Sequence, residues 1–235
     1  MISRSGSDVL AGAEATKKSS DLPVRVASAA VMLAVAGTAL WLGGLWFDLF
    51  ALVVALLCVS EFGRLALQAF AGRMAKIAAL LLGGAYIAAA AYALIILPVE
   101  VVLGVIAVVV ATDTGAYFSG RTIGGPKIAP KISPSKTWAG LGGGMLAAGL
   151  VSLAFFYSNV GERAFSPMGL VALGIGAGLA VVAQSGDFFE SWLKRKAGVK
   201  DSSNLIPGHG GVFDRVDGLL PVAIVTLLLW FGAHP

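Results

Sequence analysis

Charged residues are scarce in this chain of 235 residues. They make up 13% of the sequence, about half of the roughly 25% found in soluble domains. Hydrophobic residues make up 57%, which excludes an ordinary soluble fold and predicts a polytopic membrane protein. The single cysteine, Cys58, excludes a disulfide framework. The two histidines, His209 and His234, are far apart and remote from Cys58, so a zinc site is excluded as well.

Long apolar runs predict an all-α, polytopic membrane bundle of about seven transmembrane helices. Glycine and alanine are frequent in these runs, and small residues let membrane helices approach closely. We place the spans at residues 24–42, 45–62, 76–97, 99–119, 137–158, 167–190 and 217–233.

Basic residues predict the orientation of these spans. With seven spans, Arg163 is alone on one side, and the other 16 of the 17 Lys and Arg residues fall on the opposite side. The positive-inside rule then makes the N-terminus and the large loops cytoplasmic and puts the C-terminus outside, as for a bacterial inner-membrane protein. We expect residues 1–22 to be a flexible cytoplasmic tail and residues 23–235 to form a single membrane-embedded catalytic domain.

Polar side chains share one helical face where the sixth span leaves the membrane. Asp187, Glu190, Ser191 and Lys194 are spaced i, i+3, i+4 and i+7. Asp187 ends an apolar run, where an ionisable group usually faces the protein interior or a water-filled cavity. A buried structural ion pair would give the same pattern, but we favour metal or substrate binding.

Asp214 and Asp217 lie one helical turn apart where the seventh span begins. Acids at a helix N-terminus also suit the helix dipole. Together with Asp187 they predict a three-carboxylate site for Mg²⁺, a hard ion that favours oxygen ligands and substrate phosphates.

A glycine-rich loop, Pro207 to Gly211, comes just before these two acids. Such loops point backbone N–H groups at anions, although a plain turn has the same composition. Within the loop, His209 would donate to a phosphate or shuttle a proton.

A second polar segment follows the fourth span. Asp113, Tyr117 and Arg121 form one helical stripe, in which Arg121 either pairs with Asp113 or leaves it free for a ligand. Prolines then force an extended path whose Lys and hydroxyl side chains suit phosphate oxygens or anionic lipid headgroups. These side chains are Lys127, Lys131, Ser133, Ser135, Lys136 and Thr137. We interpret Glu61 and Arg64, at the inner end of the second span, as a structural pair.

Both polar segments resemble motifs of the phosphatidate cytidylyltransferases (CDP-diglyceride synthases). The C-terminal motif is matched by Ser191 to Arg195, Lys200 to Ser202, Pro207 to Gly211 and Asp214 to Asp217. The upstream motif is matched by Asp113 to Tyr117, Gly120-Arg121, Gly124, Lys127 and Ser133 to Thr137. Two positions depart from the family pattern, Ala139 where Glu is common and Gly218 where Ser is usual.

The resemblance implies a Mg²⁺-dependent transfer of CMP from CTP to phosphatidic acid, giving CDP-diacylglycerol and pyrophosphate in phospholipid biosynthesis. Two cations, if both bind, would bridge the attacking and leaving oxygens. The implied catalytic residues are Asp187, Asp214, Asp217 and Lys194, and Asp113 is a further metal ligand. The implied substrate contacts are Arg121, Lys127, Lys131, Ser133, Lys136, Thr137, Ser191, Arg195, His209, Gly210 and Arg215. The expected partners are CTP, phosphatidic acid and the bilayer, a homodimer is compatible with the sequence, and nucleic acid is not expected.

Two other functions remain open from the residues alone. A CTP-dependent kinase of lipid alcohols would use similar phosphate contacts, but it needs a base for the hydroxyl group. A transporter would use Asp113 and Asp187 along an ion path. Transporters usually place such charges near the midplane and contain inverted repeats, whereas the charges here gather at the cytoplasmic ends of the spans.

Overall fold

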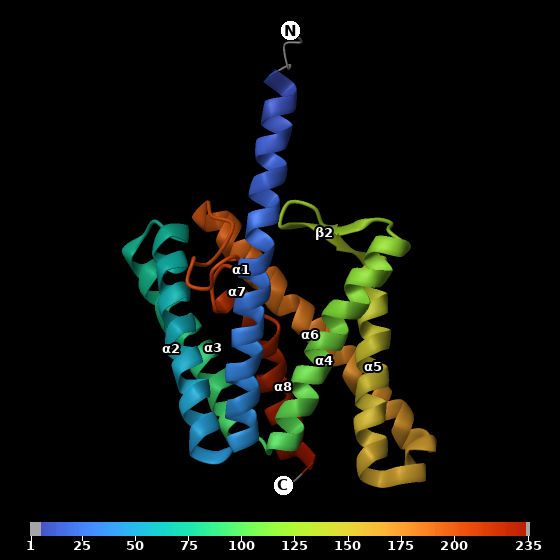
Figure 1. Ribbon diagram of the computed structural model, residues 1–235. Helices are drawn as coiled ribbons and strands as arrows, with labels where there is room; N and C mark the ends of the chain where they lie inside the picture. The colour runs from blue at the N-terminus through green and yellow to red at the C-terminus, as the bar shows by residue number, and fades with distance from the viewer. Residues whose placement is uncertain (1–5, 234–235) are drawn as a thin grey trace.

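The computed structural model describes residues 6–233, with side chains from Leu22 onward except that of Arg163. Helices stand side by side and form a bundle, from which the N-terminal part of α1 projects at one end (Figure 1). The helices are α1 (Gly6–Leu42), α2 (Gly44–Ala69), α3 (Arg73–Ile96), α4 (Val99–Thr122), α5 (Trp138–Val160), α6 (Pro167–Ala197), α7 (Phe213–Val216) and α8 (Leu219–Ala233), with a 3-10 helix η1 (Gly161–Phe165) between α5 and α6.

The prediction of an all-α polytopic membrane bundle is confirmed. Within the described residues, six helices, α1 to α6, are long and apolar enough to cross a membrane. The helix in the place of the predicted seventh span, α8, has 15 residues, fewer than the roughly 20 needed to cross the hydrocarbon core. Helix α1 begins at Gly6, well before residue 24, so it runs through most of the segment that we expected to be a tail.

Helix α6 is the element that carries most of the polar face predicted from the sequence. Its side-chain cap is Ser166, whose hydroxyl accepts a hydrogen bond from the Met168 N–H at 3.3 Å, and Pro167 occupies the first helical position. It ends at Gly198, whose φ of 73° is left-handed and therefore suits glycine. With 31 residues and a rise of about 1.5 Å per residue, α6 is longer than a bilayer core is thick. Its last turns therefore extend past the apolar region and can face polar groups.

A β-hairpin interrupts the helices between α4 and α5. Strands β1 (Lys127–Ala129) and β2 (Ser133–Thr137) are antiparallel, with Lys127 opposite Thr137. The extended path predicted from the prolines is therefore confirmed, and the two halves of that path pair with each other. A bundle that is otherwise helical thus contains one small sheet, at the polar end of α4 and α5.

Glycine lets α4 and α5 pack at very short range. A Cβ atom built on Gly115 of α4 would overlap the Gly143 carbonyl and the Ala147 side chain of α5. A buried cluster that includes Val105, Ala148 and Ala180 then joins these two helices to α6 and α8. This packing fixes the polar ends of α4, α5 and α6 relative to one another.

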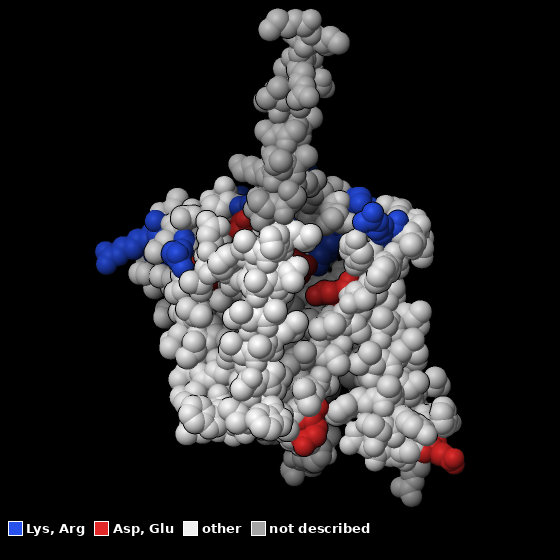
Figure 2. Space-filling view, in the orientation of Figure 1, with Lys and Arg blue, Asp and Glu red and all other residues white. Residues whose placement is uncertain are grey.

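The predicted cytoplasmic segments gather at one end of the bundle. The α2–α3 turn, the β-hairpin and the segment between α6 and α8 lie at the same end, and the C-terminus lies at the other (Figure 1). Lys and Arg side chains on the visible face are concentrated at that end (Figure 2). This arrangement agrees with the charge asymmetry of the sequence, in which nearly all basic residues fall on one side of the spans.

Candidate active site

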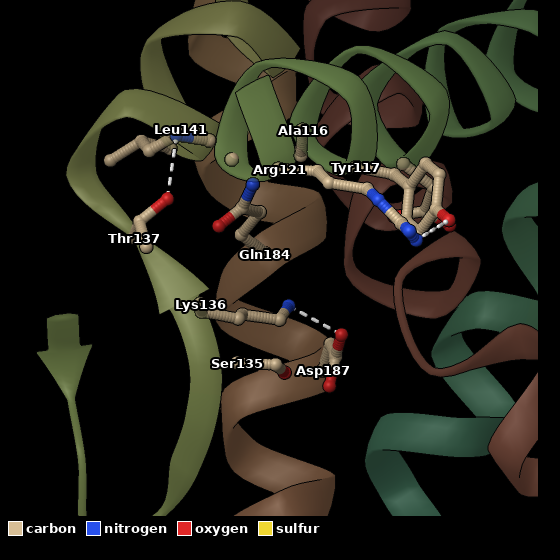
Figure 3. A pocket seen from close by; sticks show the side chains of 12 residues that line it. Ala116, Tyr117, Arg121, Ser135, Lys136, Thr137, Leu141, Gln184 and Asp187 are labelled. Carbon is tan, nitrogen blue, oxygen red and sulfur yellow. Dashed lines mark hydrogen bonds and ion pairs between the residues drawn. The ribbon is translucent and has the colours of Figure 1, made fainter. Parts of the chain in front are cut away.

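A polar cavity of about 440 Å³ opens at the charged end of the bundle. Helices α4, α5 and α6 and strand β2 all contribute to its wall, so the two polar segments of the sequence meet here (Figure 3). The charged and amide side chains that line it are Asp113, Arg121, Lys136, Gln184 and Asp187.

Lys136 and Asp187 form an ion pair across this cavity, from β2 to α6 (Figure 3). The Asp187 Oδ1 also accepts a hydrogen bond from the Ser191 hydroxyl at 3.2 Å. The Lys136 ammonium lies 4.9 Å from the centre of the Phe188 ring. Neighbouring side chains therefore hold both Lys136 and Asp187 in place. A positively charged side chain suits a phosphate, and a carboxylate suits a metal ion.

The start of α5 fixes the position of Lys136. The next residue, Thr137, is buried and caps α5, because its hydroxyl oxygen accepts a hydrogen bond from the Gly140 N–H at 3.0 Å. The Trp138 N–H donates to the Pro126 carbonyl at 3.1 Å, which ties the two ends of the hairpin together. Thr137 is thus placed beside the predicted phosphate contacts, with a role as a helix cap.

On α4, the predicted stripe of Asp113, Tyr117 and Arg121 faces the same cavity. Arg121 donates to the Tyr117 hydroxyl at 2.9 Å (Figure 3). Asp113 interacts electrostatically with Lys136 and Asp187. Of the two alternatives left open, the structure pairs Arg121 with Tyr117 and keeps its guanidinium exposed at the cavity.

Asp217 lies next to this group, at the end of α7. Its Oδ1 accepts the Gly218 N–H at 2.8 Å. Burial and then the charge of Asp187 raise the pKa of Asp217 to about 6, against the opposing effects of the Gly218 N–H and Lys136. A close contact sets this proximity, since a Cβ built on Gly186 of α6 would overlap the Asp217 carbonyl oxygen.

Asp214 has different partners from those predicted. Its Oδ1 accepts from the Lys194 ammonium at 2.7 Å, and its Oδ2 accepts from the Gly211 N–H at 2.8 Å and the Ser202 N–H at 3.0 Å. Burial opposes ionisation of this carboxyl, but Glu190, Lys194 and the two backbone donors outweigh it and hold the pKa of Asp214 well below its ordinary value. Asp214 therefore anchors the loop before α7.

Lys194 is held between two acids, at 2.9 Å from Glu190 Oε2 and 2.7 Å from Asp214 Oδ1. Glu190 and Lys194 of the α6 face thus form a buried ion-pair cluster with Asp214, while Asp187 of the same face pairs with Lys136. The structure divides that face in two. Asp187 lines the cavity and accepts a hydrogen bond from Ser191, whereas Glu190 and Lys194 belong to the loop anchor.

Among the described residues, no group of three or more His, Cys, Asp or Glu side chains lies close enough to hold a metal ion. The predicted cage of Asp187, Asp214 and Asp217 is thus not assembled as such. The acids around Lys136 are instead Asp113, Asp187 and Asp217, and the charge of Asp187 acts on both of the other two. Their hard oxygen donors fit Mg²⁺, an ion commonly bound by one or two carboxylates together with substrate phosphates.

The sequence has relatives of known name. Residues 98–231, more than half of the chain, match the model of the cytidylyltransferase family. The chain belongs to this family. A phosphatidate cytidylyltransferase of Brucella suis is 50% identical over 129 residues, which cover 54% of this chain and 44% of that protein. The protein of the same name from Haemophilus influenzae is 48% identical over 113 residues, covering 46% of this chain and 38% of the relative.

A third phosphatidate cytidylyltransferase, from Rickettsia bellii, is 44% identical over 124 residues, which cover 52% of this chain and 54% of that protein. The matches thus span about half, or less, of the length of these curated relatives. The matched family region, which begins at residue 98, includes every side chain that lines the polar cavity.

The glycine-rich loop of this cytidylyltransferase family member is tied to α1. The Ser28 hydroxyl donates to the Pro207 carbonyl at 2.8 Å and lies 3.1 Å from His209 Nδ1. Arg215 donates to the His209 carbonyl at 2.7 Å. Gly210, with a φ of 91°, packs against Asp214, where a Cβ would come within 2.8 Å of Oδ2. His209, Gly210 and Arg215 therefore shape the loop and do not line the polar cavity.

Several predicted phosphate contacts also lie outside the cavity wall. Lys127 and Lys131 are exposed on the hairpin, and Ser133 is half-buried there. Arg195 is exposed and reaches the Ile132 carbonyl at the hairpin turn with an N–O distance of 3.5 Å. These side chains therefore lie on or beside the hairpin and do not line the polar cavity.

Two residues important to the site were missed or undervalued. Gln184 lines the cavity, and its buried Oε1 has no hydrogen-bond partner within the described part of the chain. Its position three residues before Asp187 on the same helical face was the available signal. Glu61, interpreted as half of a structural pair with Arg64, is fully buried and accepts from the Ser203 hydroxyl at 2.6 Å and the Phe213 N–H at 2.8 Å.

Glu61 is therefore structural, as predicted, but with other partners. Its remaining donors are the Ser202 hydroxyl at 3.0 Å and the Val212 N–H at 3.1 Å. Because it accepts from both ends of the 202–213 loop, it holds that loop against α2. Nothing in the local sequence of α2 indicates a partner that lies more than 140 residues away in the chain.

Proposed function

We propose that the chain is a CTP:phosphatidate cytidylyltransferase, which transfers CMP from CTP to phosphatidic acid and gives CDP-diacylglycerol and pyrophosphate. The observation that carries this proposal is the polar cavity, where Lys136 and Arg121 face Asp113 and Asp187 within the matched family region. The names of the relatives support the same substrates. Because their alignments cover only part of each relative, the activity of the whole protein is our inference.

The chemistry needs no nucleophile from the protein. A phosphate oxygen of phosphatidate attacks the α-phosphorus of CTP, the new P–O bond forms, and the bond to the β-phosphate bridging oxygen breaks with release of pyrophosphate. Catalysis then consists of positioning and of neutralising charge on the phosphates. Lys136 and Arg121 supply positive charge in the cavity, and the buried Gln184 amide offers a polar contact that does not change the net charge.

Mg²⁺ is the cation that we propose for this site. Asp187 and Asp217 would hold it, with Asp113 close by, and the substrate phosphates would complete the coordination, as is common for this ion. When bound, it neutralises the polyphosphate and orients the leaving group. Lys136, which pairs with Asp187, would then be released toward a phosphate oxygen.

We further propose that the charged end of the bundle faces the cytoplasm of a bacterial inner membrane. Basic side chains gather at this end (Figure 2), and cytoplasmic loops carry an excess of Lys and Arg. CTP is made in the cytoplasm, so the cavity would open toward its soluble substrate.

The test is a product assay with the full chain in detergent–lipid micelles, supplied with CTP, phosphatidic acid and Mg²⁺. We expect stoichiometric release of pyrophosphate and CDP-diacylglycerol, strict dependence on the divalent cation, and loss of both products in Asp217→Asn. Formation of CDP and a phosphorylated lipid alcohol, when such an alcohol is supplied, would contradict the proposal in favour of a lipid kinase.

A further inference from the structure

A second cavity, apolar and larger, lies beneath the glycine-rich loop. It has a volume of about 510 Å³ and is enclosed by α1, α2, α3, α4 and the start of α8. Its walls include Val31, Ala36 and Leu40 of α1 and Phe47 and Ala55 of α2. We refer to this cavity as the slot.

The slot is long and parallel to the helices. Lining residues on α1 extend from Val31 to Leu40, and those on α2 from Phe47 to Cys58. At a rise of about 1.5 Å per residue these stretches are about 14 Å and about 17 Å long. An acyl chain fits this shape, which a compact polar metabolite would not fill.

The charge of the slot is confined to one end. Of the described residues that line the slot, Arg215 alone is charged. It lies with Ile206 and Val212 where the slot meets the loop that carries the family motif. An apolar passage that ends at a guanidinium is complementary to an anionic lipid, whose chain is apolar and whose phosphate binds Arg well.

Helix α4 connects the slot to the polar cavity. Val102 and Ile106 line the slot, while Asp113 and Tyr117 line the cavity. With 3.6 residues per turn these four positions lie within about 60° of one another on the helix surface. One face of α4 therefore runs from the slot to the charged residues of the polar cavity. A lipid lying along this face would bring its phosphate to those residues.

Helix α1 forms an outer wall that packs sparsely on the bundle. Only 6% of its apolar window is buried inside the molecule, and Val31, Leu33 and Val35 are exposed. Its Ser28 nonetheless contacts the glycine-rich loop through Pro207 and His209. A wall of this kind faces the bilayer, so a lipid entering beside α1 needs no passage through water.

We propose that the slot binds one acyl chain of the phosphatidate substrate, with the lipid phosphate directed past Arg215 toward Lys136 and Asp187. The proposal rests on the proposed function for the identity of the lipid. It assigns α1 and α2, which lie before the matched family region, to substrate binding. The preference of the enzyme for acyl-chain length should therefore depend on residues of α1 and α2, which lie outside the catalytic motifs.

Filling the slot tests this assignment. Ala36→Phe places a ring in the slot, and Ala55→Phe does so from the opposite wall. Ala34→Phe is the matched control, because Ala34 is exposed on the same helix and does not line the slot. For each variant we would compare kcat/KM for dioleoyl and dioctanoyl phosphatidate in identical micelles, at saturating CTP.

The expected result is a ratio of long-chain to short-chain kcat/KM that falls about tenfold in Ala36→Phe and Ala55→Phe, a size typical of differences in apolar pocket contacts. The ratio should stay near the wild-type value in Ala34→Phe. Retained turnover of the dioctanoyl substrate shows that the filled variants are folded. Equal ratios in all four proteins would overturn the slot assignment, whereas absence of turnover in the wild type would instead overturn the proposed function.

A binding measurement that needs no turnover completes the test. Phosphatidate with a diazirine at the end of one acyl chain should label peptides of α1 and α2, and unlabelled phosphatidate should compete better than phosphatidylcholine. Equal competition by phosphatidylcholine would show that the slot holds bulk membrane lipid, and labelling confined to the outer surface would place the chain elsewhere. Either result contradicts the proposal.

Discussion

At the scale of single residues, position relative to the cavity separates lysines that look equivalent in the sequence. Lys127 and Lys136 lie on the same hairpin, but Lys127 is exposed on β1, whereas Lys136 faces Asp187 inside the cavity. The upstream segment alone could not make this distinction, because strand pairing decides which side chains turn inward. The residue types were predictable, and their individual roles required the fold.

Lys136→Met should reduce kcat/KM for CTP on the order of 100-fold, in the range seen when one charge-stabilising group is removed from an active site. Lys127→Met, the matched control on the same hairpin, should cost only a few-fold, because its charge lies outside the cavity wall. Steady-state kinetics of the two variants under identical lipid conditions measure the difference. Equal losses would show that the phosphates also bind the exposed face of the hairpin, outside the cavity wall.

Asp214 supports a prediction about stability and pH. The pKa of Asp214 is lowered in the folded state. Its contribution to stability is therefore fully present above the pKa of an aspartate in the unfolded chain, about 3.9. That contribution is lost as the pH falls from there toward the folded pKa, since the unfolded state then binds more protons. Thermal unfolding in detergent from pH 7 to pH 3 should therefore show a smaller acid destabilisation in Asp214→Asn than in the wild type.

The control for Asp214 is Glu162→Gln, which removes an exposed acid at the opposite end of the bundle. It should leave the slope of unfolding temperature against pH unchanged. A wild-type slope in Asp214→Asn would show that the interactions of Asp214 with Lys194, Ser202 and Gly211 do not govern its ionisation.

At the scale of elements, the position of α6 against the start of α8 sets the geometry of the acids. The sequence predicted correctly that α6 continues beyond the apolar region and that Asp187 and Ser191 share a face. It could not reveal that Glu190 and Lys194 belong to a separate anchor, because Asp214 is brought to them by a loop folded back on α6. Long-range loop anchors such as Glu61 have no local pattern, so they escape periodicity arguments.

Gly186 tests this contact between elements. Gly186→Ala places a methyl group against the Asp217 carbonyl oxygen, so we expect a loss of roughly 1–3 kcal/mol of stability from overpacking and a lower kcat as Asp217 moves. Gly178→Ala is the control on the same helix, because a Cβ there meets no atom within 4 Å. Calorimetry and the product assay should show a defect in the first variant and none in the second.

At the scale of the whole molecule, the distribution of charge predicts how the bundle sits in the membrane. The helical class and the grouping of polar loops at one end followed from composition and hydropathy. The number of spans did not, because seven were predicted and six helices among the described residues are long enough to cross a membrane. The hairpin pairing, the shortness of α8 and the division of the acids between cavity and anchor did not, since they depend on contacts between distant segments.

Orientation can be measured with single cysteines in a Cys58→Ala background. Lys131→Cys lies at the hairpin turn and Glu162→Cys at the opposite end, and both positions are exposed. In spheroplasts, a membrane-impermeant maleimide should label Glu162→Cys directly and Lys131→Cys only after permeabilisation. The reverse pattern would put the cavity on the outer side, away from cytoplasmic CTP.

The fate of each phosphate of CTP tests the central claim most directly. The purified chain would be incubated with phosphatidic acid, a lipid alcohol, Mg²⁺ and CTP labelled with ³²P at either the α- or the γ-position. Transfer of CMP to phosphatidate predicts that the α-label enters the lipid fraction as CDP-diacylglycerol while the γ-label leaves as pyrophosphate. Recovery of the γ-label in the lipid fraction, with the α-label remaining in soluble CDP, would contradict it.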